Sequence, residues 1–130
     1  MGEVDEAPPS RRARFLAVTE AHALASLFGP QPGRRLLFLH DPWCPISEGA
    51  YEEMERVDAE VHLLDVSRGN GFSQTVQAAT GVRHESPQVI LLDAGEATWH
   101  ASHGRITSAS VSAALAGSEG AKGRPGRSRA

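Results

Sequence analysis

Short apolar runs alternate along this chain with longer segments in which apolar residues recur every three or four positions. The short runs are too brief for helices and predict five strands, at residues 14–18, 36–39, 60–66, 88–92 and 97–101. The longer segments predict four helices, at residues 20–28, 45–58, 72–80 and 108–115. The predicted order of elements is therefore β-α-β-α-β-α-β-β-α.

Residues typical of turns and helix ends mark the boundaries of these elements. Thr19 and Thr107 are suited to cap the N-termini of the first and last helices, and Gly81 to end the third. Residues 93–96, Asp-Ala-Gly-Glu, have the chemistry of a hairpin turn between the last two strands. Since βαβ crossovers place their strands parallel, we predict an α/β fold with a central mixed β-sheet flanked by helices on both faces.

The stretch from the second strand into the second helix carries the candidate chemistry. After the apolar run 36–39 comes a polar turn, residues 40–43 (His-Asp-Pro-Trp), and then Cys44 and Pro45. Proline is favoured at the first position of a helix, so the only cysteine lies where a strand ends and a helix begins. Free backbone N–H groups and the helix dipole favour a thiolate at such a place, which predicts a reactive thiol rather than a buried one.

Composition narrows the class of protein. The chain has 130 residues, of which 22% are charged and 40% hydrophobic, as in an ordinary soluble domain. A net charge of −3 gives no signal for nucleic acid, and no apolar segment approaches the length of a membrane span. We expect no signal peptide, because the first six residues are acidic and lack an apolar core. A lone cysteine, which can form no internal disulfide, favours the cytoplasm.

The domain organisation follows from the same patterns. Residues 1–13 are polar and without periodicity, and predict a flexible N-terminal segment. Residues 14–116 form the predicted domain, and residues 117–130 a disordered basic tail rich in glycine and serine.

Three separated motifs carry a family resemblance. They are C-P-I-S from Cys44, G-V-R-H-E-S-P-Q-V over residues 81–89 and W-H-A-S-H over residues 99–103. With the order of elements, they resemble the thioredoxin fold and, more narrowly, the monothiol bacilliredoxins of the YtxJ type. The resemblance covers about residues 18–115. It implies that Cys44 is the nucleophile, that Pro87 is a cis-proline facing it, and that Ser47 stands where a resolving cysteine would be.

The activity that this resemblance implies is thiol–disulfide exchange. A thiolate attacks a disulfide through a mixed-disulfide intermediate, and Cys44 alone cannot resolve that intermediate. The expected reaction is removal of bacillithiol from bacillithiolated proteins, with bacillithiol as a thiol co-substrate and no bound cofactor. We expect a monomer that binds neither nucleic acid nor membranes.

Other residues receive predicted roles around Cys44. Pro45 and Ser47 are expected to favour the thiolate, and Trp43 to form an apolar wall for the partner. Ser86, Pro87 and Gln88 are expected to bind an extended substrate segment through the backbone. Three of these residues also have purely structural interpretations. Ser47 is then an ordinary first-turn residue, Trp43 packs over the domain edge, and Pro87 is in trans.

The histidines of the chain do not predict a metal site. His100 and His103 lie three residues apart on a strand edge without a second cysteine or a carboxylate to complete a site, and their motif receives no chemistry. His40 and Asp41 are interpreted as surface polar residues of a turn, and the alternative is that one of them tunes the thiol or shuttles a proton.

Two other functions remain open. One is a cluster-binding protein like the monothiol glutaredoxins that hold [2Fe–2S], which the proline after Cys44 disfavours. The other is a non-catalytic interaction module with a thioredoxin-like fold.

Overall fold

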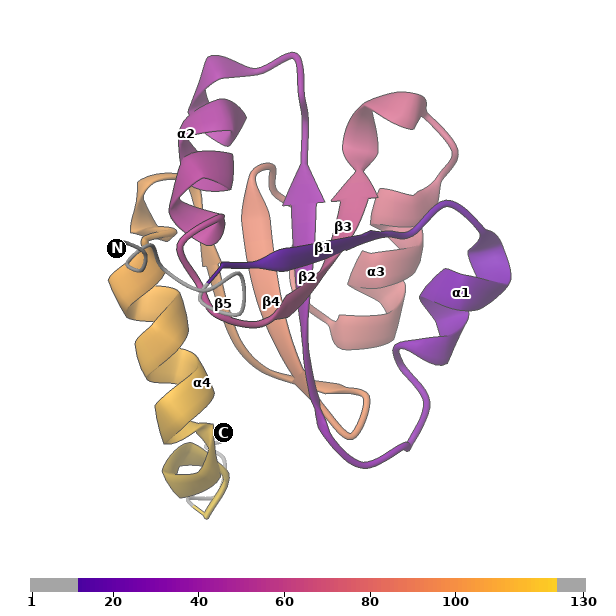
Figure 1. Ribbon diagram of the computed structural model, residues 1–130. Coiled ribbons are helices and arrows are strands. Elements are labelled where there is room, and N and C mark those ends of the chain that lie inside the picture. Colours follow the sequence, from indigo (N-terminus) through magenta and orange to yellow (C-terminus); the bar gives the residue numbers. More distant parts are fainter. Residues whose placement is uncertain (1–11, 124–130) are drawn as a thin grey trace, which may run out of the picture.

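A mixed five-stranded sheet forms the centre of the structure, a computed structural model that describes residues 12–123. The strands lie in the order β1-β3-β2-β4-β5 (Figure 1). Their bounds are Arg14–Ala17 for β1, Arg34–His40 for β2, Glu60–Asp65 for β3, Gln88–Asp93 for β4 and Glu96–Ser102 for β5. β3 pairs in parallel with both β1 and β2, whereas β4 is antiparallel to β2 and to β5. The predicted mixed sheet with a hairpin at one edge is confirmed.

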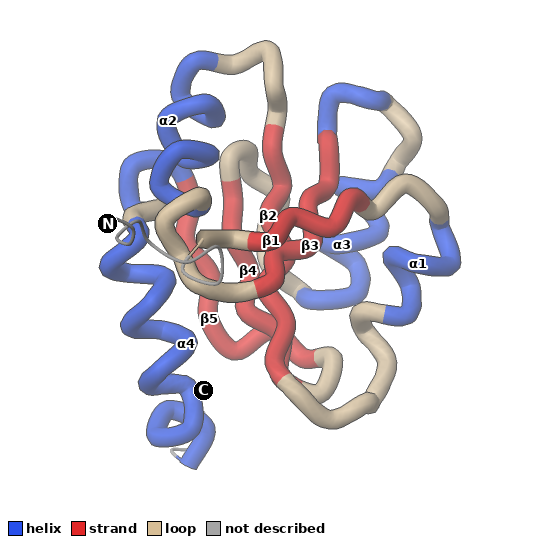
Figure 2. Tube along the Cα trace, in the orientation of Figure 1, coloured by secondary structure: helices blue, strands red, loops and turns tan. Residues whose placement is uncertain are grey.

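Helices cover both faces of the sheet, as predicted (Figure 2). The helices are α1 (Ala21–Ser26), α2 (Pro45–Met54), α3 (Phe72–Thr80) and α4 (Ser108–Gly123). One apolar core lies between the sheet and the pair α2 and α4, and a second lies between the sheet and the pair α1 and α3. The two-sided burial explains why the central strand reads as a continuous apolar run.

Alternation along β2 shows how the two cores share one strand. Leu36 and Phe38 belong to the core beneath α2 and α4, whereas Leu37 and Leu39 belong to the core beneath α1 and α3. All four are buried. Each such side chain contributes about 1.5–3 kcal/mol on burial, so β2 anchors both layers.

The hairpin between β4 and β5 turns at Ala94 and Gly95, as the turn chemistry predicts. Both residues have positive φ, 52° and 85°, the conformation that two-residue hairpin loops require. A Cβ at residue 95 would collide with backbone atoms of Phe28 and Gly29, so glycine here also lets the turn lie against the end of the α1 segment.

Two helix ends differ from the predictions. The predicted N-cap at Thr19 is wrong: Glu20 is still extended, and its carbonyl accepts the first helical bond from Leu24 N at 3.1 Å. The helix predicted to reach residue 58 ends at Met54, because the backbone hydrogen bonds that follow span three residues instead of four. The N–H of Val57 donates to the carbonyl of Met54 at 3.0 Å, which turns the Val57 side chain into the core.

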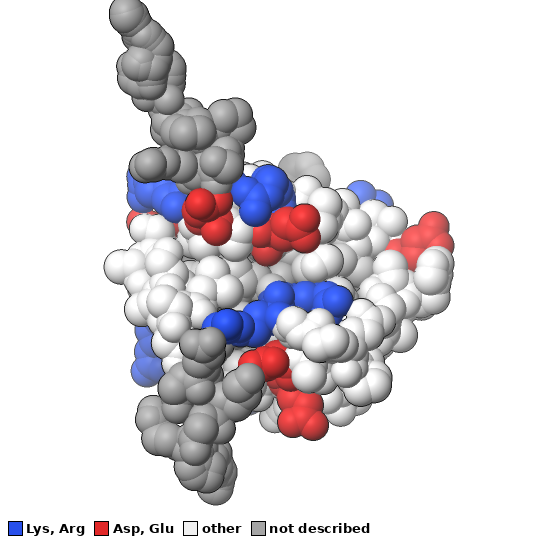
Figure 3. Space-filling model, turned by 60° about the horizontal axis from the view of Figure 1, so that its bottom comes forward, with Lys and Arg blue, Asp and Glu red and all other residues white. Residues whose placement is uncertain are grey.

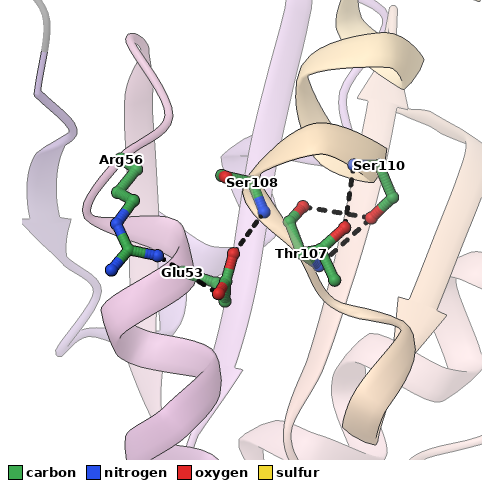
Figure 4. A network of polar contacts seen from close by, with 5 residues as sticks. All are labelled: Glu53, Arg56, Thr107, Ser108 and Ser110. Atoms are coloured by element: carbon green, nitrogen blue, oxygen red, sulfur yellow. Dashed lines mark hydrogen bonds and ion pairs between the residues drawn. The ribbon is translucent and has the colours of Figure 1, made fainter.

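The N-terminus of α4 is capped as predicted. The hydroxyl of Thr107 accepts the N–H of Ser110 at 3.0 Å, and the hydroxyl of Ser110 accepts the N–H of Thr107 at 3.1 Å (Figure 4). A carboxylate oxygen of Glu53, on α2, accepts the N–H of Ser108 at 2.7 Å. Arg56 lies 3.2 Å from the other oxygen of Glu53. This network joins the end of α2 to the start of α4.

The predicted domain bounds, residues 14 and 116, and the predicted disordered tail stay predictions. Helix α4 is described as far as Gly123. Glycines inside a helix cost only about 1 kcal/mol each relative to alanine, and this segment also contains several alanines. Ala13, within the predicted flexible segment, donates its N–H to the carbonyl of Glu55 at 3.2 Å. The rest of that segment, residues 1–11, and the tail residues 124–130 lie outside the described residues.

Charged side chains of both signs lie close together on the face in Figure 3. There, basic groups stand beside acidic ones and neither sign covers the face alone. None of the helices between residues 12 and 123 is long and apolar enough to cross a bilayer.

Candidate active site around Cys44

Cys44 occupies the junction that the sequence predicts, between β2 and α2. It is the N-cap residue of α2, with an extended backbone (φ −108°, ψ 123°), and Pro45 is the first helical residue. No side-chain hydrogen bond caps this helix end, and the thiol is free and partly exposed. The ends of β2 and β3 meet at one edge of the sheet, where His40 pairs with Asp65, and Cys44 follows four residues after that edge.

Asp41 holds the turn that carries the cysteine. Its carbonyl oxygen accepts the N–H of Cys44 at 3.1 Å, and its carboxylate accepts the N–H of Trp43 at 3.0 Å. Its own N–H donates to the hydroxyl of Ser47 at 2.9 Å. These three bonds tie the turn to the first turn of α2.

Ser47 lies behind the turn, fully buried. Its hydroxyl lies 2.8 Å from Nδ1 of His40 and accepts the N–H of Asp41. A bond from this hydroxyl to the sulfur of Cys44 is not among the hydrogen bonds of the described residues. The direct role predicted for Ser47, donation to the thiolate, therefore has no hydrogen bond to support it here.

His40 is buried, and its interpretation as a surface residue is wrong. Its ring is 7% exposed, with ring-centre distances of 5.3 Å to Phe38 and 5.0 Å to Tyr51. Burial lowers the pKa of His40, although the nearby carboxylates of Glu48, Asp65 and Asp41 act in the opposite direction. The lowered pKa favours the neutral imidazole at neutral pH. The signal was present in the sequence, because His40 shares the face of Leu36 and Phe38 at a spacing of two.

Two large apolar side chains flank the cysteine at the surface. Trp43 is 84% exposed and Ile46 is 60% exposed. Among the described residues, Leu16 is the only other exposed large hydrophobic residue. Trp43 thus does not pack over the domain edge, and the surface beside the thiol is apolar, as at protein-binding sites.

The segment before β4 brings the second motif to the same edge. Gln88 pairs with Leu39 of β2, so the preceding residues continue beyond the end of that strand pair, and the Ser86–Pro87 peptide bond is cis, as the resemblance implies. The side chain of Gln88 is buried. It donates to the carbonyl of Arg83 at 3.0 Å and accepts the N–H of Glu85 at 3.3 Å. This side chain therefore braces the segment from within, leaving only backbone atoms of residue 88 for a substrate.

The histidine motif of residues 99–103 joins this segment. The N–H of His103 donates to the carbonyl of Pro87 at 3.1 Å, and its ring lies 3.5 Å from the carboxylate of Glu85. The hydroxyl of Ser102 donates to the same carboxylate and lowers the pKa of Glu85, assisted by His103. The motif that received no chemistry thus holds the Pro87 segment in place.

Two polar atoms in this region are buried without a hydrogen-bond partner among the described residues. They are the hydroxyl oxygen of Ser86 and Nδ1 of His84. Unsatisfied buried polar atoms are rare in native proteins, so the Pro87 segment contains groups that a binding partner could satisfy.

Two hollows lie near the other strand ends of this edge. One, of about 230 Å³, is lined by Ala17, Val18, Thr19, Leu63, Asp65, Arg68 and Asn70. The other, of about 430 Å³, is lined by Val66, Gly69, Asn70, Gly71, Ser73, Gln74 and His84. Neither of these two hollows is lined by Cys44. Within residues 12–123, no group of three or more His, Cys, Asp or Glu residues could hold a metal ion.

The family model "Monothiol bacilliredoxin BrxC" matches residues 17–111. The chain belongs to this family. That match includes Cys44 and the two motifs that meet at Pro87, and it supports a redox function.

Solved structures agree on the fold. A thioredoxin-fold protein with a proposed oxidoreductase activity aligns with a TM-score of 0.71 at 25% identity, covering 78% of this chain and 93% of the other. A mutant thioredoxin from Halobacterium salinarum aligns with a TM-score of 0.55 at 22% identity, covering 87% and 94%. Malassezia sympodialis thioredoxin gives 0.62 at 13% identity, covering 88% and 96%. These likenesses establish a thioredoxin fold for this bacilliredoxin.

Proposed function

We propose that this protein removes bacillithiol from protein mixed disulfides, using Cys44 as its only nucleophile. The observation that carries the proposal is the placement of Cys44. The single thiol lies partly exposed at the open N-terminus of α2, in a chain of the monothiol bacilliredoxin family. Ser47 stands where a dithiol protein would have its second cysteine.

The reaction proceeds in two exchanges. The Cys44 thiolate attacks the bacillithiol sulfur of the mixed disulfide, a bond forms between these two sulfurs, and the client protein leaves as a thiolate that takes a proton from water. A second low-molecular-weight thiol then attacks the bacillithiol sulfur on Cys44. That step forms a small disulfide and returns Cys44 as a thiolate, so the number of electrons is conserved at each exchange.

The surface around Cys44 supports a protein client. Trp43 and Ile46, which are one and two residues from Cys44 in the chain, offer exposed apolar side chains for contact with a client. The backbone of Ser86, Pro87 and Gln88 would pair with an extended client segment, and the Ser86 hydroxyl would gain a partner there. Pro45 contributes by opening the helix whose N-terminus favours the thiolate.

The remaining features of the proposal concern context. The protein acts as a monomer in the cytoplasm, where cellular thiols keep a lone cysteine reduced. Its partners are bacillithiolated proteins and free bacillithiol, and the enzyme holds no cofactor of its own between turnovers.

Intact mass spectrometry tests the proposal. The protein is mixed with a bacillithiolated client protein or, in parallel, with the same client carrying glutathione, across a range of pH. We expect the bacillithiol mass to move from the client to Cys44, and to do so faster than glutathione does. Cys44→Ala should accept neither thiol. Slow, unselective transfer that begins only at alkaline pH would contradict the proposal.

A further inference from the structure

The pair of His40 and Ser47 lies behind the Cys44 turn, and the exchange reaction itself gives it no role. His40 is the last residue of β2, and Ser47 lies in the first turn of α2. Both are buried, in a layer of otherwise apolar side chains between the sheet and α2. Burying polar groups costs free energy unless they are hydrogen-bonded, so this pair points to a requirement at this place.

The hydroxyl of Ser47 takes part in two hydrogen bonds. A backbone N–H only donates, so the oxygen of Ser47 accepts from Asp41 at 2.9 Å. The same hydroxyl lies 2.8 Å from Nδ1 of His40, and it donates its hydrogen to Nδ1 when the neutral ring carries its proton on Nε2. The carboxylates of Asp41, Glu48 and Asp65 and the ring of Tyr51 face the imidazole, and burial nevertheless outweighs the carboxylates and keeps its pKa low.

This arrangement forms a chain of hydrogen bonds that ends at the nucleophile. Nδ1 of His40 is hydrogen-bonded to Ser47, Ser47 accepts from the N–H of Asp41, and the carbonyl of Asp41 accepts the N–H of Cys44 at 3.1 Å. The carboxylate of Asp41 fixes the neighbouring N–H of Trp43 in the same turn. One buried hydroxyl therefore connects the end of β2, the cysteine turn and the first turn of α2.

We propose that His40 and Ser47 are positioning residues that lock the Asp41 turn and so hold the Cys44 sulfur at the N-terminus of α2. The inference rests on the proposed function only in taking Cys44 as the reacting thiol. Ser47 acts at the sulfur indirectly, through Asp41, rather than by donating a hydrogen bond to it. His40 acts one step further away, through the orientation of the Ser47 hydroxyl.

Alkylation of Cys44 by iodoacetamide tests this inference in the full-length protein. The sulfur displaces iodide and forms a thioether, the thiolate is the reacting form, and no other cysteine competes. We compare the rate from pH 5 to pH 9 in the wild type, Ser47→Ala, His40→Phe and the double variant. Phenylalanine retains a ring to stack on Phe38 and Tyr51 but offers no acceptor to Ser47.

We expect each single variant to move the midpoint of the alkylation profile upward by about half a pH unit, as a thiolate loses part of its contact with the helix N-terminus. The double variant should move it no further, because both changes break one chain of hydrogen bonds. His40→Asn keeps an acceptor near the position of Nδ1 and should return the midpoint toward the wild-type value.

Val111→Ala provides the matched control for lost stability. Val111 is buried on α4 in the same core as α2, and it takes no part in the hydrogen bonds around Cys44. We expect its alkylation profile to keep the wild-type midpoint. If Ser47→Ala does not fold, the comparison of His40→Phe with His40→Asn decides the question.

Three results would overturn the inference: wild-type midpoints in both single variants, additive shifts in the double variant, or an equal shift in Val111→Ala. Because iodoacetamide replaces bacillithiol as the probe, the result is independent of the proposed function. If these shifts are observed but the protein takes no bacillithiol from a client, the positioning role of His40 and Ser47 stands. Only the proposed function is then contradicted.

Discussion

Two helix N-termini of this protein are built in opposite ways. At α4, the hydroxyls of Thr107 and Ser110 each accept the other residue's N–H, and Glu53 accepts the N–H of Ser108 (Figure 4). At α2, the N-cap is Cys44, and no side chain caps the helix with a hydrogen bond. Both helices pack on the same face of the sheet, so the difference is local.

The comparison distinguishes a helix N-terminus that stabilises the fold from one that is suited to a reaction. Helix N-termini carry backbone N–H groups without helical partners, and side-chain oxygens that accept them stabilise the fold. The α4 end is closed in this way, and its groups are satisfied within the protein. A weak acceptor such as a thiol satisfies these groups poorly, but as a thiolate it gains from them and from the helix dipole. The open end at α2 is therefore the one at which chemistry can occur.

Cys44→Ser makes the α2 end resemble the α4 end and should have the largest effect on activity. The hydroxyl cannot form a disulfide, so thiol exchange should be lost completely. Serine is a favoured N-cap and Cys44 already has the extended backbone of a cap. The free energy of unfolding should rise by about 0.5–1 kcal/mol, measured by urea denaturation.

Cys44→Ala is the control, because it removes the thiol and supplies no capping oxygen. It should lose exchange without the gain in unfolding free energy. A serine variant no more stable than the alanine variant would show that the α2 N-terminus is already satisfied, and the comparison between the two helix ends would fail.

Thr107→Ala opens the α4 end and should affect stability alone. Loss of the N-cap oxygen should lower the free energy of unfolding by about 1 kcal/mol. The rate of Cys44 alkylation at neutral pH should stay that of the wild type, since Thr107 lies in none of the hydrogen bonds around Asp41. Thr107→Ser keeps the oxygen and should keep most of the stability. An altered alkylation rate in Thr107→Ala would mean that the two ends are coupled.

The predictions from the sequence were accurate where one residue dictates the local structure. Pro45 begins α2, Gly81 ends α3 with a positive φ of 75°, and Thr107 caps α4. The α/β fold followed from the spacing of apolar runs, because a strand buried on both faces and an amphipathic helix have different periods. Each of these signals depends on a few neighbouring residues, so the sequence alone is enough to predict the structure at those places.

The predictions were wrong where tertiary contacts decide. The spacing of two from Phe38 placed His40 on a core-facing side of β2, but only the packing of α2 decides whether the last residue of that strand is covered. For Ser47 the sequence left two interpretations open, donation to the thiolate and an ordinary first-turn residue, and its hydrogen bonds in the fold are with His40 and Asp41. The link of Pro87 and Glu85 to His103 joins segments far apart in the chain, and no local pattern encodes it.

The pH dependence of the α4 cap gives the smallest expected effect. The N–H of Ser108, and then the charge of Arg56, lower the pKa of Glu53 below its ordinary value of 4.5. A carboxylate with a lowered pKa in the folded state stabilises the fold above the pKa of the unfolded state, and this contribution is lost as pH falls through the folded pKa. Glu53→Gln keeps an acceptor for Ser108 but carries no charge. Its Tm should therefore lie slightly below that of the wild type at pH 7, and the two should converge as the pH falls through the lowered pKa of Glu53.

Glu52→Gln is the matched control for Glu53→Gln, because it removes the same charge from an exposed neighbouring position on α2. Its Tm difference from the wild type should not follow the same pH dependence. Equal behaviour of the two variants would mean that the net charge of α2, and not the contact with Ser108, sets the acid stability. In that case the carboxylate of Glu53 would not contribute to capping α4. The contrast with α2 would then depend only on the hydroxyls of Thr107 and Ser110.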